Sequence, residues 1–79
     1  MINYNKNLFR EFLVYPDYKT LYLFEDKKRY NKLLLYVITL IENYGKDFIL
    51  NEYKSIIKNF IPDTLEQTKI NLNKVNIII

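Results

Sequence analysis

The residue types that carry most enzymatic chemistry are scarce in this chain of 79 residues, which contains neither cysteine nor histidine. Their absence removes the thiol nucleophile, the thiolate metal site and the imidazole base. The single serine, Ser55, is followed three residues later by Lys58, and a Ser–Lys pair can act as nucleophile and base. Both fall on the polar face of a predicted surface helix, where water would keep the lysine charged. We therefore expect a solvated pair rather than a catalytic one.

The acidic residues and the glycine content support the same exclusion. The nine carboxylates include no pair directed towards an apolar face, where burial could raise the pKa of a general acid. One glycine cannot form a phosphate-binding loop, and the sequence contains no P-loop, dinucleotide-binding or EF-hand motif. The sequence therefore predicts a protein that is not an enzyme and that uses no metal or other cofactor.

A cluster of cations is the first candidate binding feature, and it consists of Lys27, Lys28, Arg29 and Lys32. The whole chain has a net charge of +3, and the cluster lies where a helix is predicted to begin. Cations at that end oppose the partial positive charge of the helix N-terminus. The conflict disappears if the helix begins nearer Tyr30, or if the cluster meets an anion such as a nucleic-acid backbone or an acidic partner. The alternative is a solvated, lysine-rich first turn.

Apolar side chains are the second candidate feature, because 49% of the residues are hydrophobic and 16% are aromatic. A domain of this size buries only about 60% of the surface that its unfolded chain exposes. Exposed aromatic and aliphatic side chains mark protein-binding surfaces, and tyrosine provides contact area at low entropic cost. Each candidate could instead belong to the core. The candidate partner-binding residues are Tyr15, Tyr18, Tyr22, Leu35, Tyr36, Ile77, Ile78 and Ile79.

The first half of the chain contains two helical patterns around an ambiguous segment. Apolar spacing over residues 5–15 predicts a helix that Pro16 ends. The run LYLF at residues 21–24 fits a short buried strand or a helical turn, so a hairpin over residues 12–24 is an alternative. A 3.6-residue period predicts a long central helix over about residues 27–44. Asp26 is its expected N-cap, and Gly45 is expected to end it in the left-handed conformation.

The second half contains two further helical patterns and an apolar end. An amphipathic helix is predicted from Asp47, its expected N-cap, to Phe60. Asp63 and Glu66 have the spacing of a capping box and predict a last helix reaching about Val75. The alternation over residues 69–79 also fits a C-terminal strand. We expect the three terminal isoleucines to dock on the core, to pair as a strand or to be held by another chain, since chain ends normally fray into water.

Two motifs, LIENYGKDF at residues 40–48 and TLEQTK at residues 64–69, resemble those of a Myb/SANT-type three-helix DNA-binding domain over about half of the chain. The resemblance implies a recognition helix over residues 64–76 whose asparagines, at positions 71, 73 and 76, read adenine edges. The chain departs from the family pattern because it has no tryptophan and a longer segment between Gly45 and Pro62. The implied recognition helix is also nearly neutral, which gives it little affinity for phosphates.

Together these observations predict one all-α domain over residues 1–79, a small bundle of three to four helices packed around the central helix. The alternative is an α+β domain with the hairpin or the C-terminal strand. The expected function is stoichiometric protein binding by an inhibitor, an antitoxin or immunity-type protein, or an adaptor. A small DNA- or RNA-binding regulator that uses the four clustered cations is the alternative.

The expected source and location follow from composition. The bias towards Ile, Asn, Lys, Tyr and Phe is typical of an AT-rich genome, and a chain this small favours a phage or mobile element. The sequence has no secretory signal and no apolar run near the about 20 residues that a membrane span requires. We therefore expect a cytoplasmic protein without a membrane partner. A homodimer that covers the terminal isoleucines is a further hypothesis.

Overall fold

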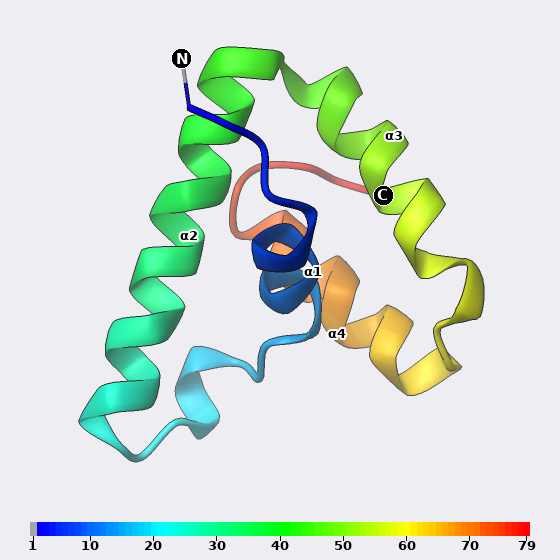
Figure 1. Ribbon diagram of the computed structural model, residues 1–79. Helices are drawn as coiled ribbons and strands as arrows, with labels where there is room; N and C mark the ends of the chain where they lie inside the picture. The colour runs from blue at the N-terminus through cyan, green and yellow to red at the C-terminus, as the bar shows by residue number, and fades with distance from the viewer. Residues whose placement is uncertain (1) are drawn as a thin grey trace.

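The computed structural model describes residues 2–79, and within that range all regular secondary structure is helical (Figure 1). Four α-helices and two short 3-10 helices follow each other along the chain: α1 Lys6–Val14, η1 Tyr18–Thr20, α2 Phe24–Tyr44, α3 Lys46–Ile56, η2 Ile57–Asn59 and α4 Pro62–Asn73. The predicted all-α bundle is confirmed. The alternative strands at residues 12–24 and 69–79 do not form, because η1 and α4 occupy those segments.

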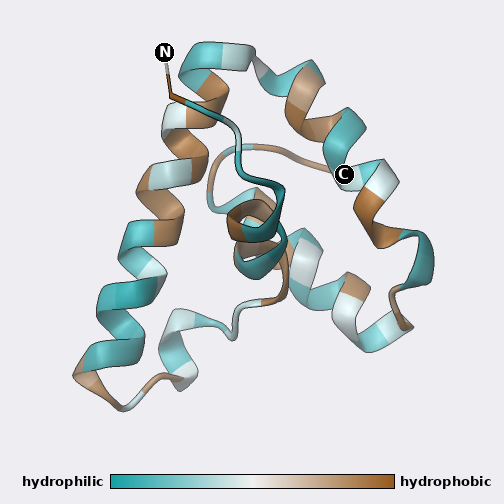
Figure 2. Cartoon of the chain, viewed as in Figure 1, coloured by the Kyte–Doolittle hydropathy of each residue, from teal (hydrophilic) through white to brown (hydrophobic). Residues whose placement is uncertain are grey.

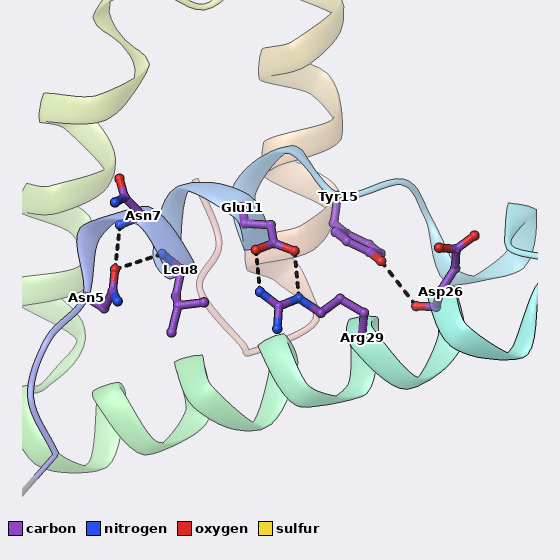
Figure 3. Close-up of polar contacts among 7 residues, drawn as sticks. All are labelled: Asn5, Asn7, Leu8, Glu11, Tyr15, Asp26 and Arg29. Carbon is purple, nitrogen blue, oxygen red and sulfur yellow. Dashed lines mark hydrogen bonds and ion pairs between the residues drawn. The ribbon is translucent and has the colours of Figure 1, made fainter.

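Helix α1 begins at a side-chain cap and ends at a proline. The Asn5 side-chain oxygen accepts hydrogen bonds from the backbone N–H groups of Asn7 and Leu8, at 3.0 and 3.2 Å (Figure 3). These bonds satisfy two of the donors that a helix leaves without partners at its N-terminus. Phe12 is buried on one face, and Pro16 prevents the helix from continuing beyond Tyr15.

Helix α2 begins at Phe24, three residues before the predicted start, and the Asp26 cap is therefore wrong. Leu23 occupies the N-cap position and makes no side-chain hydrogen bond. The earlier start places Glu25 and Asp26 in the first turn, where their negative charge is favourable. It also moves the clustered cations away from the N-terminal end, so the electrostatic conflict seen in the sequence is removed without a later helix start.

Gly45 joins α2 directly to α3 and serves as the C-cap of one and the N-cap of the other. Its φ of 91° is positive as predicted, but its ψ of 163° is extended, so the predicted left-handed helical conformation is wrong. This region is accessible almost only to glycine. Because the chain turns sharply at this residue, α3 starts at once and Asp47 lies in its first turn rather than at its N-cap.

Helix α4 begins at Pro62, and the predicted capping box of Asp63 and Glu66 does not form. Pro62 occupies the first helical position, where its fixed φ suits a helix and its missing N–H would have had no partner. The N-cap is Ile61, which makes no side-chain hydrogen bond. The regular helix ends at Asn73, two residues before the predicted end.

Helix α1, rather than α2, occupies the middle of the bundle. It packs against both α2 and α4, while α2 packs against α3 (Figure 1). The predicted central helix is therefore an edge helix, because only one side of it meets the rest of the protein. The buried cluster around α1 consists of Phe9, Phe12, Leu13, Leu33, Val37, Leu40, Ile49, Tyr53, Leu72, Val75 and Ile77.

Two polar residues of α4 are fully buried against the end of α1. The Asn71 amide nitrogen donates to the carbonyl oxygens of Phe12 and Tyr15, at 3.0 and 2.9 Å. The Thr68 hydroxyl donates to the Leu13 carbonyl at 2.9 Å. These carbonyls lie at the C-terminal end of α1, where a helix leaves acceptors without intrahelical donors, although the Phe12 carbonyl also accepts from the Tyr15 N–H at 3.3 Å. Side chains of α4 thus take the place of a C-cap on α1.

Candidate functional site

The segment between η1 and α2 carries three consecutive exposed apolar side chains, which we call the apolar corner. The exposed fractions are 91% for Tyr22, 66% for Leu23 and 73% for Phe24. In Figure 2, hydrophobic residues mark this turn at the start of α2, at the lower edge of the molecule. Tyr22 was a predicted partner-binding residue, whereas Leu23 and Phe24 were not. The run LYLF was the available signal, and periodicity alone cannot distinguish a buried run from an exposed one.

The apolar corner stands on an ordered base. Leu21 is buried, and its backbone N–H donates to the Tyr18 carbonyl at 3.1 Å. The Thr20 hydroxyl donates to the Asp17 carbonyl at 2.8 Å. The Tyr18 ring lies 5.4 Å from the Tyr30 ring, centroid to centroid. These contacts hold the backbone on both sides of the corner, so little backbone entropy remains to be lost when a partner binds.

Tyr15 lies beneath this base rather than on the open surface. It is half-buried, with its ring 6.2 Å from that of Tyr30. Its hydroxyl donates to the Asp26 carbonyl at 3.4 Å (Figure 3). Burial, followed by the negative charge of Asp26, raises the pKa of Tyr15 above its usual value. Among these three predicted tyrosines, Tyr18 and Tyr22 are therefore exposed, whereas Tyr15 makes its contacts within the fold.

The four clustered cations have separate environments. Arg29 forms a two-bond ion pair with Glu11 of α1, at 2.8 and 2.6 Å (Figure 3). The hydrogen bond from Arg29 lowers the pKa of the Glu11 carboxyl. The Lys27 ammonium lies over the Tyr18 ring, 5.8 Å from its centroid. Lys28 and Lys32 are exposed one turn apart on α2 and, with Arg29, line a shallow hollow.

The remaining α2 candidates, Leu35 and Tyr36, have different surroundings. Leu35 is 64% exposed on the side of the helix away from the core. Tyr36 is half-buried, and its hydroxyl accepts a hydrogen bond from the Asn5 backbone N–H at 2.6 Å. That bond ties the N-terminal segment to α2. Leu35 is thus available at the surface, while the polar group of Tyr36 is engaged within the fold.

The terminal isoleucines separate into one docked and two exposed residues. Asn76 has a positive φ of 65°, and its N–H donates to the Asn73 carbonyl at 3.0 Å. The Ile77 N–H donates to the Leu72 carbonyl at 3.0 Å, which completes a Schellman motif. Ile77 is buried in the core beside Leu72, whereas Ile78 is 84% exposed.

The implied nucleic-acid-reading role does not fit Asn71. Its side chain is fully buried and bonds to α1, so it cannot reach a base edge. Asn73 and Asn76 are exposed.

Within residues 2–79, no cluster of acidic side chains could hold a metal ion, and no helix is long and apolar enough to cross a membrane. Comparison of the chain with protein-family models, with curated proteins and with solved structures gives no match.

Proposed function

We propose that this protein is a non-enzymatic protein-binding module whose partner contacts the apolar corner. The observation that carries the proposal is the exposure of three consecutive apolar side chains, Tyr22, Leu23 and Phe24, on an ordered base. Full burial of an exposed Leu or Phe side chain is worth about 1.5–3 kcal/mol. A partner that covers the corner therefore recovers hydrophobic free energy that folding alone leaves unused.

The chemistry of the apolar corner indicates the kind of partner surface. It is a projecting group of aromatic and aliphatic side chains, and tyrosine is enriched at the energetic centres of interfaces. Such a group fits an apolar pocket on another protein. Binding of this type acts by occupying the partner's surface in equal amounts, as an inhibitor, an immunity-type protein or an adaptor does.

A nucleic-acid-binding role receives less support from the same region. Arg29 is paired with Glu11, and Lys27 lies over Tyr18. Lys28 and Lys32 are the other two cations of the predicted cluster, and two phosphate contacts supply little of the charge-driven affinity that nucleic-acid binding requires.

Affinity capture from extract of the source cells tests the proposal, using the wild-type protein and a variant with Tyr22, Leu23 and Phe24 all changed to Ser. Ile61→Ser is the matched control, because Ile61 is also an exposed apolar N-cap residue but lies before α4. All three proteins are first shown to have the same far-ultraviolet circular dichroism.

The expected result is one protein recovered in nearly equal amount by the wild type and by Ile61→Ser, resistant to nuclease and lost with the corner variant. Recovery of the same protein by the corner variant would place binding elsewhere and contradict the proposal. If the wild type instead recovers nucleic acid, and this recovery is lost when Lys28 and Lys32 are changed to Glu, the result would support the alternative of a DNA- or RNA-binding regulator.

A further inference from the structure

The outward face of α2 carries a regular pattern that the core of the monomer does not use. Six exposed residues follow each other at alternating spacings of four and three: Phe24, Lys28, Asn31, Leu35, Ile38 and Glu42. This spacing is that of the a and d positions of a coiled coil. The buried residues of the same helix, Tyr30, Leu33, Val37 and Leu40, form a separate stripe that faces α1 and α3. We call the six exposed residues the outer seam.

The middle of the outer seam is apolar. Leu35 and Ile38 are 64% and 38% exposed, and the half-buried side chains of Leu34 and Ile41 adjoin them. Ile38 and Ile41 also line a surface hollow between α2 and the segment that follows α4. Helix α2 thus carries both an exposed leucine and a surface hollow. In coiled-coil packing, a side chain of one helix inserts into such a hollow on the facing helix.

The charges of the outer seam distinguish between the two directions in which a second helix could lie. Lys28 is in the N-terminal half of α2, and Glu42 is near the C-terminal end. A parallel copy would place lysine beside lysine and glutamate beside glutamate. An antiparallel copy avoids both like-charge contacts, and it also opposes the two helix dipoles. The charges of the face therefore favour the antiparallel direction over the parallel one.

We propose that this protein forms an antiparallel homodimer through residues 31–42 of the outer seam, with Leu35 of each copy packed against Ile38 of the other. In this register Asn31 faces Glu42 of the second copy, and its amide can donate a hydrogen bond to that carboxylate. Lys32 lies one residue further along α2, near the same carboxylate. Because of the twofold symmetry, the Leu35–Ile38 contact occurs twice near the axis, and the Asn31–Glu42 hydrogen bond occurs once at each end of the interface.

The proposed dimer leaves the apolar corner free. Because Leu35 pairs with Ile38, the two α2 helices overlap over residues 29–44, and Phe24 lies beyond the overlap. With a rise of 1.5 Å per residue, the two corners are about 40 Å apart at opposite ends of the dimer. Ile78 and Ile79 lie outside this interface, so the surface differs from the predicted homodimer through the terminal isoleucines.

Sedimentation equilibrium over a concentration series tests the dimer directly. We expect the wild-type mass to rise from 9.7 kDa towards twice that value as the concentration increases. Leu35→Lys should weaken association by about 100-fold or more, because it removes two apolar contacts and adds two cations. It should leave the helical content unchanged, since the Leu35 side chain is exposed. Tyr22→Lys is the matched control and should associate like the wild type.

Disulfide trapping tests the direction and the register, and the absence of cysteine in the chain makes it unambiguous. Asn31→Cys mixed with Glu42→Cys should give a covalent dimer under mild oxidation, whereas either variant alone should give little. Covalent dimers from each variant alone would indicate a parallel arrangement and contradict the proposal. A wild-type protein that stays monomeric at about 1 mM, or a dimer that Leu35→Lys leaves intact, would also contradict it. None of these results depends on the partner of the apolar corner.

Discussion

Asn71 and Thr68 lie fully buried between α1 and α4, whereas Tyr22 and Leu23 lie in water before α2. The two regions thus place polar groups inside and apolar groups outside, against the usual distribution. In the first region every buried amide and hydroxyl has a carbonyl partner on α1. In the second region these side chains are mostly exposed, and no residue within 2–79 encloses them. The polar pair is explained by contacts within the fold, whereas the apolar corner has no such contacts and is the surface that we propose for binding.

This difference separates the residues that maintain the fold from those available for binding. A buried polar group without a partner costs about 1–3 kcal/mol, so changes between α1 and α4 should affect folding strongly. Exposed apolar side chains contribute little to folding, so changes at the corner should affect binding and leave stability unchanged or improved. The predictions below test this separation, from the largest expected effect to the smallest.

Asn71→Leu should lower the free energy of unfolding by about 2–4 kcal/mol. The leucine has a similar size but cannot donate to the carbonyls of Phe12 and Tyr15. The Tyr15 carbonyl would lose this donor, while the Phe12 carbonyl would keep the Tyr15 N–H. Urea unfolding followed by circular dichroism measures the change. Asn73→Leu is the control, because Asn73 is exposed on the same helix. Equal free energies of unfolding for the two variants would show that the buried hydrogen bonds of Asn71 make no net contribution to stability.

Leu23→Asp should raise the free energy of unfolding by about 0.5–2 kcal/mol and weaken partner capture at the same time. Leu23 occupies the N-cap position of α2 without a side-chain hydrogen bond, and aspartate would supply one to a free N–H. Ile61→Asp makes the same change before α4, so it should raise stability and leave capture intact. If both Leu23→Asp and Ile61→Asp raise stability and still capture the partner fully, the proposed binding role of the apolar corner is contradicted.

Glu11→Gln should lower the free energy of unfolding at pH 7 by about 0.5–1 kcal/mol, since the ion pair with Arg29 is partly exposed. Arg29 lowers the pKa of Glu11 in the folded state. The contribution is therefore fully present above the unfolded pKa of about 4.3 and is lost as the pH falls through the folded value.

Urea midpoints of the wild type and of Glu11→Gln should consequently differ at pH 7 and converge near about pH 3. Glu66→Gln on α4 is the control and should match the wild type at both pH values, because Glu66 is exposed. A difference between Glu11→Gln and the wild type that persists unchanged at low pH would show that it does not arise from the ionised pair.

The helices were predictable from apolar spacing, while several of their ends were not. Phe9, Phe12 and Leu13 in α1, and Leu33, Val37 and Leu40 in α2, are buried as the 3.6-residue period indicates. Asp26, Asp47 and Asp63 were each expected to be an N-cap, and each lies in the first turn instead. A residue type that favours the N-cap is also favourable in the first turn, so the type alone does not determine the position.

The candidate site was predictable only in part. Tyr22 and Leu35 are exposed, in agreement with their selection as candidates, but Tyr15 and Tyr36 make contacts within the fold and Ile77 is in the core. The buried Ile77 could have been anticipated, because Asn76 is suited to the left-handed residue of a Schellman motif and the motif draws the next apolar residue onto the helix.

The sequence by itself determined that this protein is helical, which faces of its helices are apolar and that the usual catalytic groups are missing, because these properties depend on residue types and on spacing along one chain. Only the tertiary structure decided which apolar residues remain in water, that α1 rather than α2 lies at the centre, and that Arg29 pairs with Glu11. Those outcomes depend on contacts between segments far apart in the sequence. A short helix can be enclosed by its neighbours, whereas a long helix extends past them and leaves part of its surface exposed.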